Sequence, residues 1–230
     1  MKNSPSWRAW DITRGWRRSK KKNTAKNGRP LQRSSPVGAA KSGLNGEDRS
    51  PGTIIEEVAI VFQYGSNCSD SQMNSPERLC GDARFVDIAE TVDDFELAFD
   101  VLSTRRGCAA SNLVRRPGAK AWGVLYEIPD YLISRETAKL RGRKSFDAIE
   151  GEGANYKRET IQVRRPGGQP LPALTYTVID PQPNLTTDLA YVEHIVTGLR
   201  ERGVPASYIE NVKAIAAANN PEIAHQVADL

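Results

Sequence analysis

The chain has 230 residues, of which 39% are hydrophobic and 26% are charged, a composition typical of a soluble globular domain. Its length favours one sizeable domain over two. No stretch approaches the roughly 18 apolar residues of a membrane-spanning helix, and no apolar run follows the basic N-terminus as it would in a secretory signal peptide. We therefore expect a cytoplasmic protein without a membrane span.

Three cysteines, Cys68, Cys80 and Cys108, stand at irregular spacings. An odd number argues against a disulfide framework and favours free thiols in a reducing compartment. The two histidines, His194 and His225, do not combine with them into a zinc-binding pattern. We therefore expect no metal and no cofactor.

The net charge of +4 is distributed unevenly along the chain. Residues 1–50 contain 13 Lys or Arg and carry a net charge of about +10, which leaves about −6 for residues 51–230. Residues 1–53 have too few apolar side chains to offset the entropy of folding. We predict a disordered basic extension there and one globular domain over residues 54–230.

Trp7, Trp10 and Trp16 are the apolar exception in this extension, because they lie among arginines. Such a mixture leaves open a patch for RNA or a membrane surface. A basic tail without a specific partner is the favoured interpretation, so we expect nucleic-acid binding to be at most a property of the tail.

Short apolar or alternating runs predict seven strands, over residues 57–63, 84–88, 95–102, 111–114, 121–128, 156–164 and 173–179. Helices are expected from Ser69 or Asp70 to about residue 79, and over residues 129–140 and 146–150. A C-terminal helix pair follows, with Tyr191 on the apolar face of its first member. Strands followed by helices are typical of α+β domains. We predict a small mixed β-barrel or curved sheet flanked by helices.

The sequence Phe62-Gln-Tyr-Gly-Ser-Asn67 ends the first predicted strand and forms the turn after it. Further blocks follow in order: Trp122-Gly-Val-Leu-Tyr126, Phe146-Asp-Ala-Ile-Glu-Gly151, Tyr156-Lys-Arg158, and the helix pair from Tyr191 to Tyr208. Together these blocks resemble the motifs of the γ-glutamylcyclotransferase-like (AIG2-like) family over roughly residues 57–218. The ordered set carries the resemblance, because the Tyr-Gly-Ser-Asn turn alone is a weak signal.

The resemblance implies an enzyme that converts a γ-glutamyl amino acid or amine to 5-oxoproline and a free amine. The substrate's own α-amine attacks its γ-carbonyl, so the protein mainly has to hold the substrate in an attacking geometry. The amine must first lose a proton, and the leaving amine must later gain one. Glu150 matches the family's catalytic carboxylate, and a partly apolar site would raise its pKa so that it can do both.

The resemblance also implies that a small-molecule substrate is bound by Val61, Phe62, Gln63, Tyr64, Gly65, Ser66, Asn67, Tyr156 and Tyr191. Successive backbone N–H groups in a glycine-containing turn form a concave anion site. Such a site suits the substrate's α-carboxylate or the oxyanion that develops on its γ-carbonyl. Tyr176 either lines the same pocket or packs in the core.

Two alternatives stay open. The same chemistry could act on another substrate, such as a γ-glutamyl amine, and the segment from Tyr131 to Lys144, longer than in compact members of the family, could control that choice. Alternatively, the chain is a non-catalytic member of the same fold whose basic extension binds nucleic acid or an anionic surface. The presence of both the turn and Glu150 favours the enzyme, because a binding module needs neither.

Overall fold

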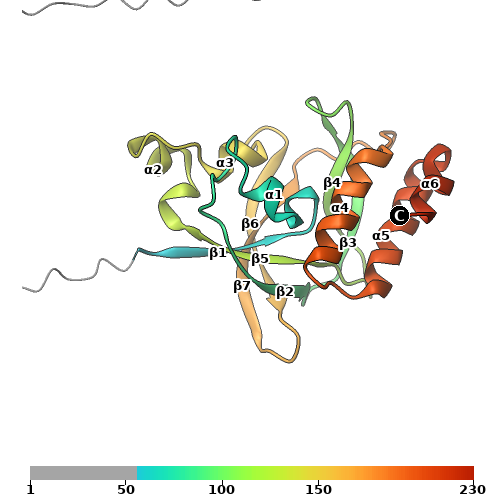
Figure 1. Ribbon diagram of the computed structural model, residues 1–230, viewed down its shortest axis with the longest axis horizontal. Coiled ribbons are helices and arrows are strands. Elements are labelled where there is room, and N and C mark those ends of the chain that lie inside the picture. The colour runs from blue at the N-terminus through green and yellow to red at the C-terminus, as the bar shows by residue number, and fades with distance from the viewer. Residues whose placement is uncertain (1–55) are drawn as a thin grey trace, which may run out of the picture. The chain divides into compact units, whose positions relative to one another are not determined.

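The computed structural model describes residues 56–230 (Figure 1). The predicted disordered extension, residues 1–53, lies outside these residues, and so does its tryptophan and arginine patch. Within residues 56–230, no helix combines the length and the apolar character needed to cross a bilayer.

Five strands form a closed barrel in the order β1 (Val58–Gln63), β5 (Trp122–Pro129), β2 (Arg84–Thr91), β6 (Tyr156–Arg164) and β7 (Pro170–Val178). Strand β5 is antiparallel to both of its neighbours, and β6 pairs with β7 along its whole length. A parallel pair, Val61 with Leu174, joins β7 to β1 and closes the barrel. The strands β3 (Phe95–Ser103) and β4 (Cys108–Arg115) form a separate hairpin.

Helices flank this barrel on two sides (Figure 1). On one side lie α2 (Arg135–Leu140) and α3 (Phe146–Glu150), and on the side of the β3–β4 hairpin lie α4 (Leu189–Glu201), α5 (Ala206–Asn219) and α6 (Ala224–Ala228). A 3-10 turn, η1 (Ser66–Cys68), and the short helix α1 (Asp70–Met73) follow β1. The predicted α+β class with a small mixed barrel is confirmed, and the predicted strands shift by a few residues at their ends.

The predicted helix from residue 69 to about residue 79 is wrong beyond Met73. Helix α1 has four residues, and turns follow it. A proline at position 76 disfavours the helical conformation of Ser75. Asn74 instead bonds to the backbone of Ala83, donating through Nδ2 to its carbonyl and accepting from its N–H, both at 2.9 Å.

The predicted helix over residues 129–140 is also wrong, because the chain forms two short elements there. The 3-10 turn η2 (Asp130–Leu132) ends before Ser134, which has an extended backbone and accepts a hydrogen bond from Thr137 N. A serine in this conformation satisfies a free N–H of the following helix and so starts a new one, α2.

Large aromatic side chains are buried on the barrel strands and at the contact with α3. Phe62, Tyr126, Phe146 and Tyr176 are each at most 2% exposed. The rings of Phe146 and Tyr176 meet edge to face with their centroids 5.3 Å apart, a favourable arrangement for aromatic pairs. This contact fixes α3 against β7 and thereby sets the position of Glu150 at the end of the helix.

Helix α4 rests directly on the turn after β1. A Cβ atom on Gly198 would lie 2.6 Å from the backbone nitrogen of Ser69 and 2.9 Å from the carbonyl carbon of Cys68. These separations are shorter than packed atoms allow, so the absence of a side chain at Gly198 permits the contact. Helix α4 therefore supports η1 from behind.

Candidate active site

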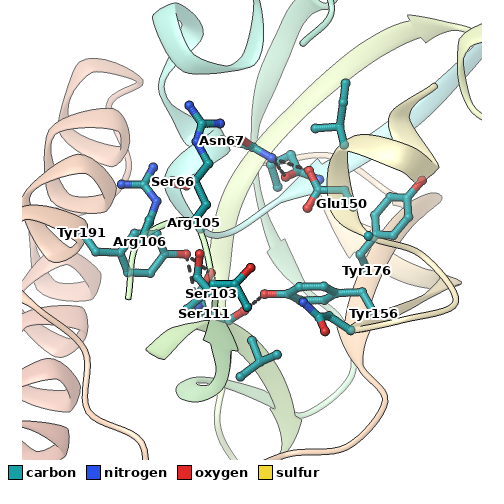
Figure 2. Close-up of a pocket in the computed structure, with 18 of the residues that line it drawn as sticks. Ser66, Asn67, Ser103, Arg105, Arg106, Ser111, Glu150, Tyr156, Tyr176 and Tyr191 are labelled. Atoms are coloured by element: carbon teal, nitrogen blue, oxygen red, sulfur yellow. Dashed lines mark hydrogen bonds between the residues drawn. The ribbon is translucent and has the colours of Figure 1, made fainter. Parts of the chain in front are cut away.

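A cavity of about 310 Å³ lies between the turn after β1, the turn of the β3–β4 hairpin and the end of α3 (Figure 2). Strands β6 and β7 contribute Tyr156 and Tyr176 to its wall, and α4 contributes Tyr191. Segments far apart in the sequence thus enclose a space of the size that small-molecule sites have.

Glu150 enters this cavity from the last turn of α3. Ser145 caps the helix by accepting a hydrogen bond from Ala148 N at 3.0 Å, and the helix ends at Gly151. The Glu150 side chain is 15% exposed. Burial raises the pKa of Glu150, while Arg78 and the hydrogen bond from Asn67 partly oppose that effect.

A chain of amide hydrogen bonds connects the turn to this carboxylate (Figure 2). Asn67 Nδ2 donates to Glu150 Oε1 at 2.5 Å and to Gln63 Oε1 at 3.1 Å. Gln72 Nε2 donates to Asn67 Oδ1 at 3.1 Å and to Ser66 Oγ at 2.5 Å. Because the Asn67 oxygen already accepts from Gln72, its amide nitrogen is the group that faces the carboxylate.

On the opposite wall, Ser111 of β4 joins two tyrosines (Figure 2). Its hydroxyl lies 2.9 Å from the Tyr191 hydroxyl, its N–H donates to the same hydroxyl at 3.1 Å, and its carbonyl accepts from Tyr156 Oη at 2.8 Å. A Cβ atom on Gly65 would lie 2.2 Å from Ser111 Oγ, so glycine allows the turn to approach β4 this closely. Burial raises the pKa of both tyrosines, and their hydroxyls therefore stay protonated at neutral pH.

Two other carboxylates near the end of α3 make structural contacts. Asp147 Oδ1 accepts from Tyr176 Oη at 2.8 Å, and Arg158 Nη1 lies 3.1 Å from both Asp147 oxygens. Glu152 pairs with Arg135 at 2.8 Å. Neither carboxylate lines the cavity.

The cavity brings together most of the residues that the sequence resemblance assigned to substrate, namely Gln63, Tyr64, Gly65, Ser66, Asn67, Tyr156 and Tyr191, together with Glu150. Tyr64 is held in place by donating its hydroxyl to the Tyr176 carbonyl at 2.5 Å. Val61 and Phe62 do not line the cavity, and both side chains are fully buried. Their predicted role in substrate binding therefore has no geometric support. Within the segment 131–144, Lys144 lines the cavity and α2 does not.

The sequence motifs missed several cavity residues, among them Arg78, Arg105, Arg106 and Ser111, and also Gln72, which donates to Ser66 and Asn67. The adjacent arginines before Gly107 mark a basic turn and offered a weak signal. The others carried none, because their roles depend on contacts between distant segments.

Cys80 is exposed, while Cys68 and Cys108 are buried, and all three thiols are free. Burial raises the pKa of Cys68 well above its usual value. Across residues 56–230, no three His, Cys, Asp or Glu side chains are grouped so that they could hold a metal ion.

Comparisons with known proteins agree with this architecture. Residues 120–212 match the model of the AIG2-like family. A solved structure named "Gamma-glutamyl cyclotransferase" superposes with a TM-score of 0.57 at 22% identity, covering 69% of this chain and 88% of that one. The uncharacterized protein loc79017 from Homo sapiens gives a TM-score of 0.57 at 24% identity, with 70% and 89% covered. The structure of YkqA from Bacillus subtilis superposes with a TM-score of 0.57 at 18% identity, covering 71% of this chain and 55% of that one.

No curated protein matches the sequence. The structural likenesses, all below 25% identity, demonstrate a shared fold. The matched residues 120–212 include α3 with its terminal Glu150, the strands β6 and β7, and helix α4. The chain is therefore AIG2-like over residues 120–212 and has the γ-glutamylcyclotransferase-like fold, which confirms the resemblance predicted from its motifs.

Proposed function

We propose that this protein is a γ-glutamyl cyclotransferase, which converts a γ-glutamyl amino acid or amine to 5-oxoproline and the free amine. The observation that carries the proposal is the environment of the Glu150 carboxyl group. This carboxyl group has a raised pKa and lies in a cavity of about 310 Å³, hydrogen-bonded to the turn at residues 64–67.

In the proposed reaction, the Glu150 carboxylate accepts a proton from the substrate's α-ammonium group. The neutral amine then attacks the γ-carbonyl carbon and closes a five-membered ring. As the bond to the leaving amine breaks, protonated Glu150 returns the proton to the departing nitrogen. The ring nitrogen gives up its second proton to the released amine, so the products are the neutral lactam of 5-oxoproline and an ammonium ion. The reaction is balanced without water, and a tethered nucleophile needs no assistance beyond positioning and proton transfer.

The turn provides donors for the substrate's negative charges. No backbone carbonyl of residues 56–230 accepts from the N–H groups of Gly65, Ser66 or Asn67, which are the free donors at the start of η1. They suit the α-carboxylate or the developing oxyanion. The protonated hydroxyls of Tyr156 and Tyr191 line the same cavity and can contribute further donors.

The surrounding residues favour this chemistry over a covalent mechanism. The thiol nearest the turn, Cys68, is fully buried and donates to the Gln63 carbonyl at 3.2 Å. Burial also disfavours its nucleophilic thiolate form. Ser66 Oγ accepts from Gln72, and no histidine lines the cavity among the described residues, so Ser66 lacks the usual base of a serine nucleophile.

Release of 5-oxoproline from a panel of γ-glutamyl amino acids and amines tests the proposal. We expect Glu150→Gln to lower kcat/KM by about 10²- to 10⁴-fold, the usual contribution of a general acid–base. Glu152→Gln is the matched control, because it makes the same change two residues away at a side chain that pairs with Arg135 outside the cavity. Equal turnover by wild type and Glu150→Gln would refute the catalytic role. Absence of turnover in every case would favour the alternative, a non-catalytic member of the fold.

A further inference from the structure

The cavity is strongly basic. Four cationic side chains line it, from Arg78, Arg105, Arg106 and Lys144, and Glu150 is the one acidic residue among the described residues of the lining. The lining therefore carries a net charge of about +3 when Glu150 is ionised. A γ-glutamyl amine is a zwitterion at its glutamyl end and has no net charge, so it would leave this excess uncompensated.

Arg78 shows that the protein compensates this charge only in part. Arg78 Nη1 is buried without a hydrogen-bond acceptor in residues 56–230, and its nearest carboxylate oxygen, Glu150 Oε1, is 3.7 Å away. Burial lowers the pKa of Arg78, Glu150 partly opposes that effect, and the neighbouring Arg105 and Arg106 add to it. Three guanidinium groups thus lie close enough to repel one another, an arrangement that an anionic ligand would stabilise.

The two arginines of the hairpin turn are held on the side of the cavity that faces Glu150 (Figure 2). The N–H groups of Arg106 and Gly107 both donate to the Ser103 carbonyl, at 3.1 and 2.7 Å, which makes the turn tight. Arg106 Nη2 donates to Gln72 Oε1 at 2.8 Å, and its guanidinium carbon lies 4.9 Å from the centre of the Tyr191 ring. These contacts orient Arg106 before any ligand binds.

Arg105 is exposed and makes no ion pair with a described carboxylate. If the glutamyl amine and α-carboxylate bind at Glu150 and the turn after β1, the leaving amine extends across the cavity towards the hairpin turn. Arg105 and Arg106 are the cationic groups that line the cavity there.

We propose that the cavity selects γ-glutamyl compounds whose leaving amine carries an anionic group, and that Arg105 and Arg106 bind that group. This inference rests on the proposed cyclotransferase function. It makes the β3–β4 turn, rather than the segment 131–144, the main determinant of specificity. Carboxylate and phosphate share the chemistry that guanidinium groups recognise.

The test compares γ-glutamyl-ethylamine, γ-glutamyl-alanine and γ-glutamyl-aspartate, whose leaving amines carry none, one and two carboxylates. For the full-length wild type we expect kcat/KM to rise along this series, by about tenfold for the first carboxylate, since hydrogen bonds to charged groups are stronger than neutral ones. Arg105→Gln should lower kcat/KM about fivefold for the two charged compounds, because Arg105 is exposed and its contribution is screened. It should leave the uncharged compound within about twofold.

Arg165→Gln is the matched control, since it removes the same charge from an exposed residue of the β6–β7 loop outside the cavity. Equal turnover of the three compounds, or an equal loss for all of them in Arg105→Gln, would overturn the inference while leaving the cyclotransferase intact. Calorimetric titration of the same compounds into Glu150→Gln separates the two proposals. Charge-dependent and salt-sensitive binding that Arg105→Gln weakens would support the anion site even without turnover, and charge-independent binding would refute it.

Discussion

The close approach of Gly65 to Ser111 gives a prediction that can be worked out in detail. Gly65 has φ −106°, a value open to any residue, so its requirement for glycine is spatial rather than conformational. In Gly65→Ala the new Cβ would lie 2.2 Å from Ser111 Oγ and 3.4 Å from the Tyr191 hydroxyl oxygen. The first separation is more than 1 Å below ordinary van der Waals contact, and one of the two groups must move.

The cost depends on which group moves. If the Ser111 hydroxyl rotates away, it loses its 2.9 Å hydrogen bond with Tyr191, which is a loss of about 1 kcal/mol. If the turn moves instead, overpacking costs about 1–3 kcal/mol. We expect Gly65→Ala to lower the free energy of unfolding by about 2 kcal/mol, and Tm by about 4–8 °C for a domain of this size. Displacing the turn also moves Asn67 relative to Glu150, so kcat/KM should fall as well.

Denaturant unfolding of a double-mutant cycle measures this contact. Ser111→Ala alone should cost about 1 kcal/mol through the lost hydrogen bond. In the Gly65→Ala/Ser111→Ala double variant the obstructing oxygen is gone, so its total cost should also be about 1 kcal/mol instead of the additive value of about 3 kcal/mol. Additive costs, or an unchanged stability in Gly65→Ala, would refute the reasoning.

Three further predictions concern the support and accessibility of the site. Asn67→Ala removes a hydrogen bond that stabilises the Glu150 carboxylate, which raises its pKa further. Because a base must be deprotonated, the acid limb of the kcat/KM profile should move to higher pH, and an unmoved limb would contradict this role. Gly198→Ala should cost about 1–3 kcal/mol in urea unfolding, since its Cβ would meet Ser69 N at 2.6 Å. Finally, a thiol reagent should rapidly modify only the exposed Cys80 in the native protein, and the two buried thiols should react after unfolding. Mass spectrometry counts the adducts, and more than one rapid adduct would contradict this prediction.

Local signals in the sequence were sufficient to predict most of the fold. The alternation of residues 156–164 matched β6 from end to end, and Phe146 to Glu150 followed by a glycine matched α3. These elements are specified by contacts within the segment or by its pattern of burial. The two helices that were predicted wrongly are interrupted by side-chain hydrogen bonds, such as that of Asn74 to the Ala83 carbonyl, nine residues away. The helix propensity of a segment carries no information about such contacts.

The predicted site residues divide in the same way. The turn after β1 and Glu150 were identified from ordered motifs, and the cavity contains both. Ser111 and Arg78 lie on segments without any motif, and their place in the cavity follows from the packing of the β3–β4 hairpin and the segment after α1 against the barrel. Conversely, Phe62 belongs to the motif and Val61 precedes it, but both side chains are buried. Adjacency along a strand therefore does not amount to a shared surface.

The identity of the products tests the central claim most directly. The full-length protein would be incubated with γ-glutamyl-alanine in ¹⁸O-labelled water, and the products would be resolved by mass spectrometry. If the α-amine is the nucleophile and Glu150 transfers the proton, the products are 5-oxoproline and alanine in equal amounts. No label from the solvent should be incorporated, and Glu150→Gln should abolish most of the turnover. Release of glutamate carrying ¹⁸O would instead show hydrolysis by water and would contradict the account.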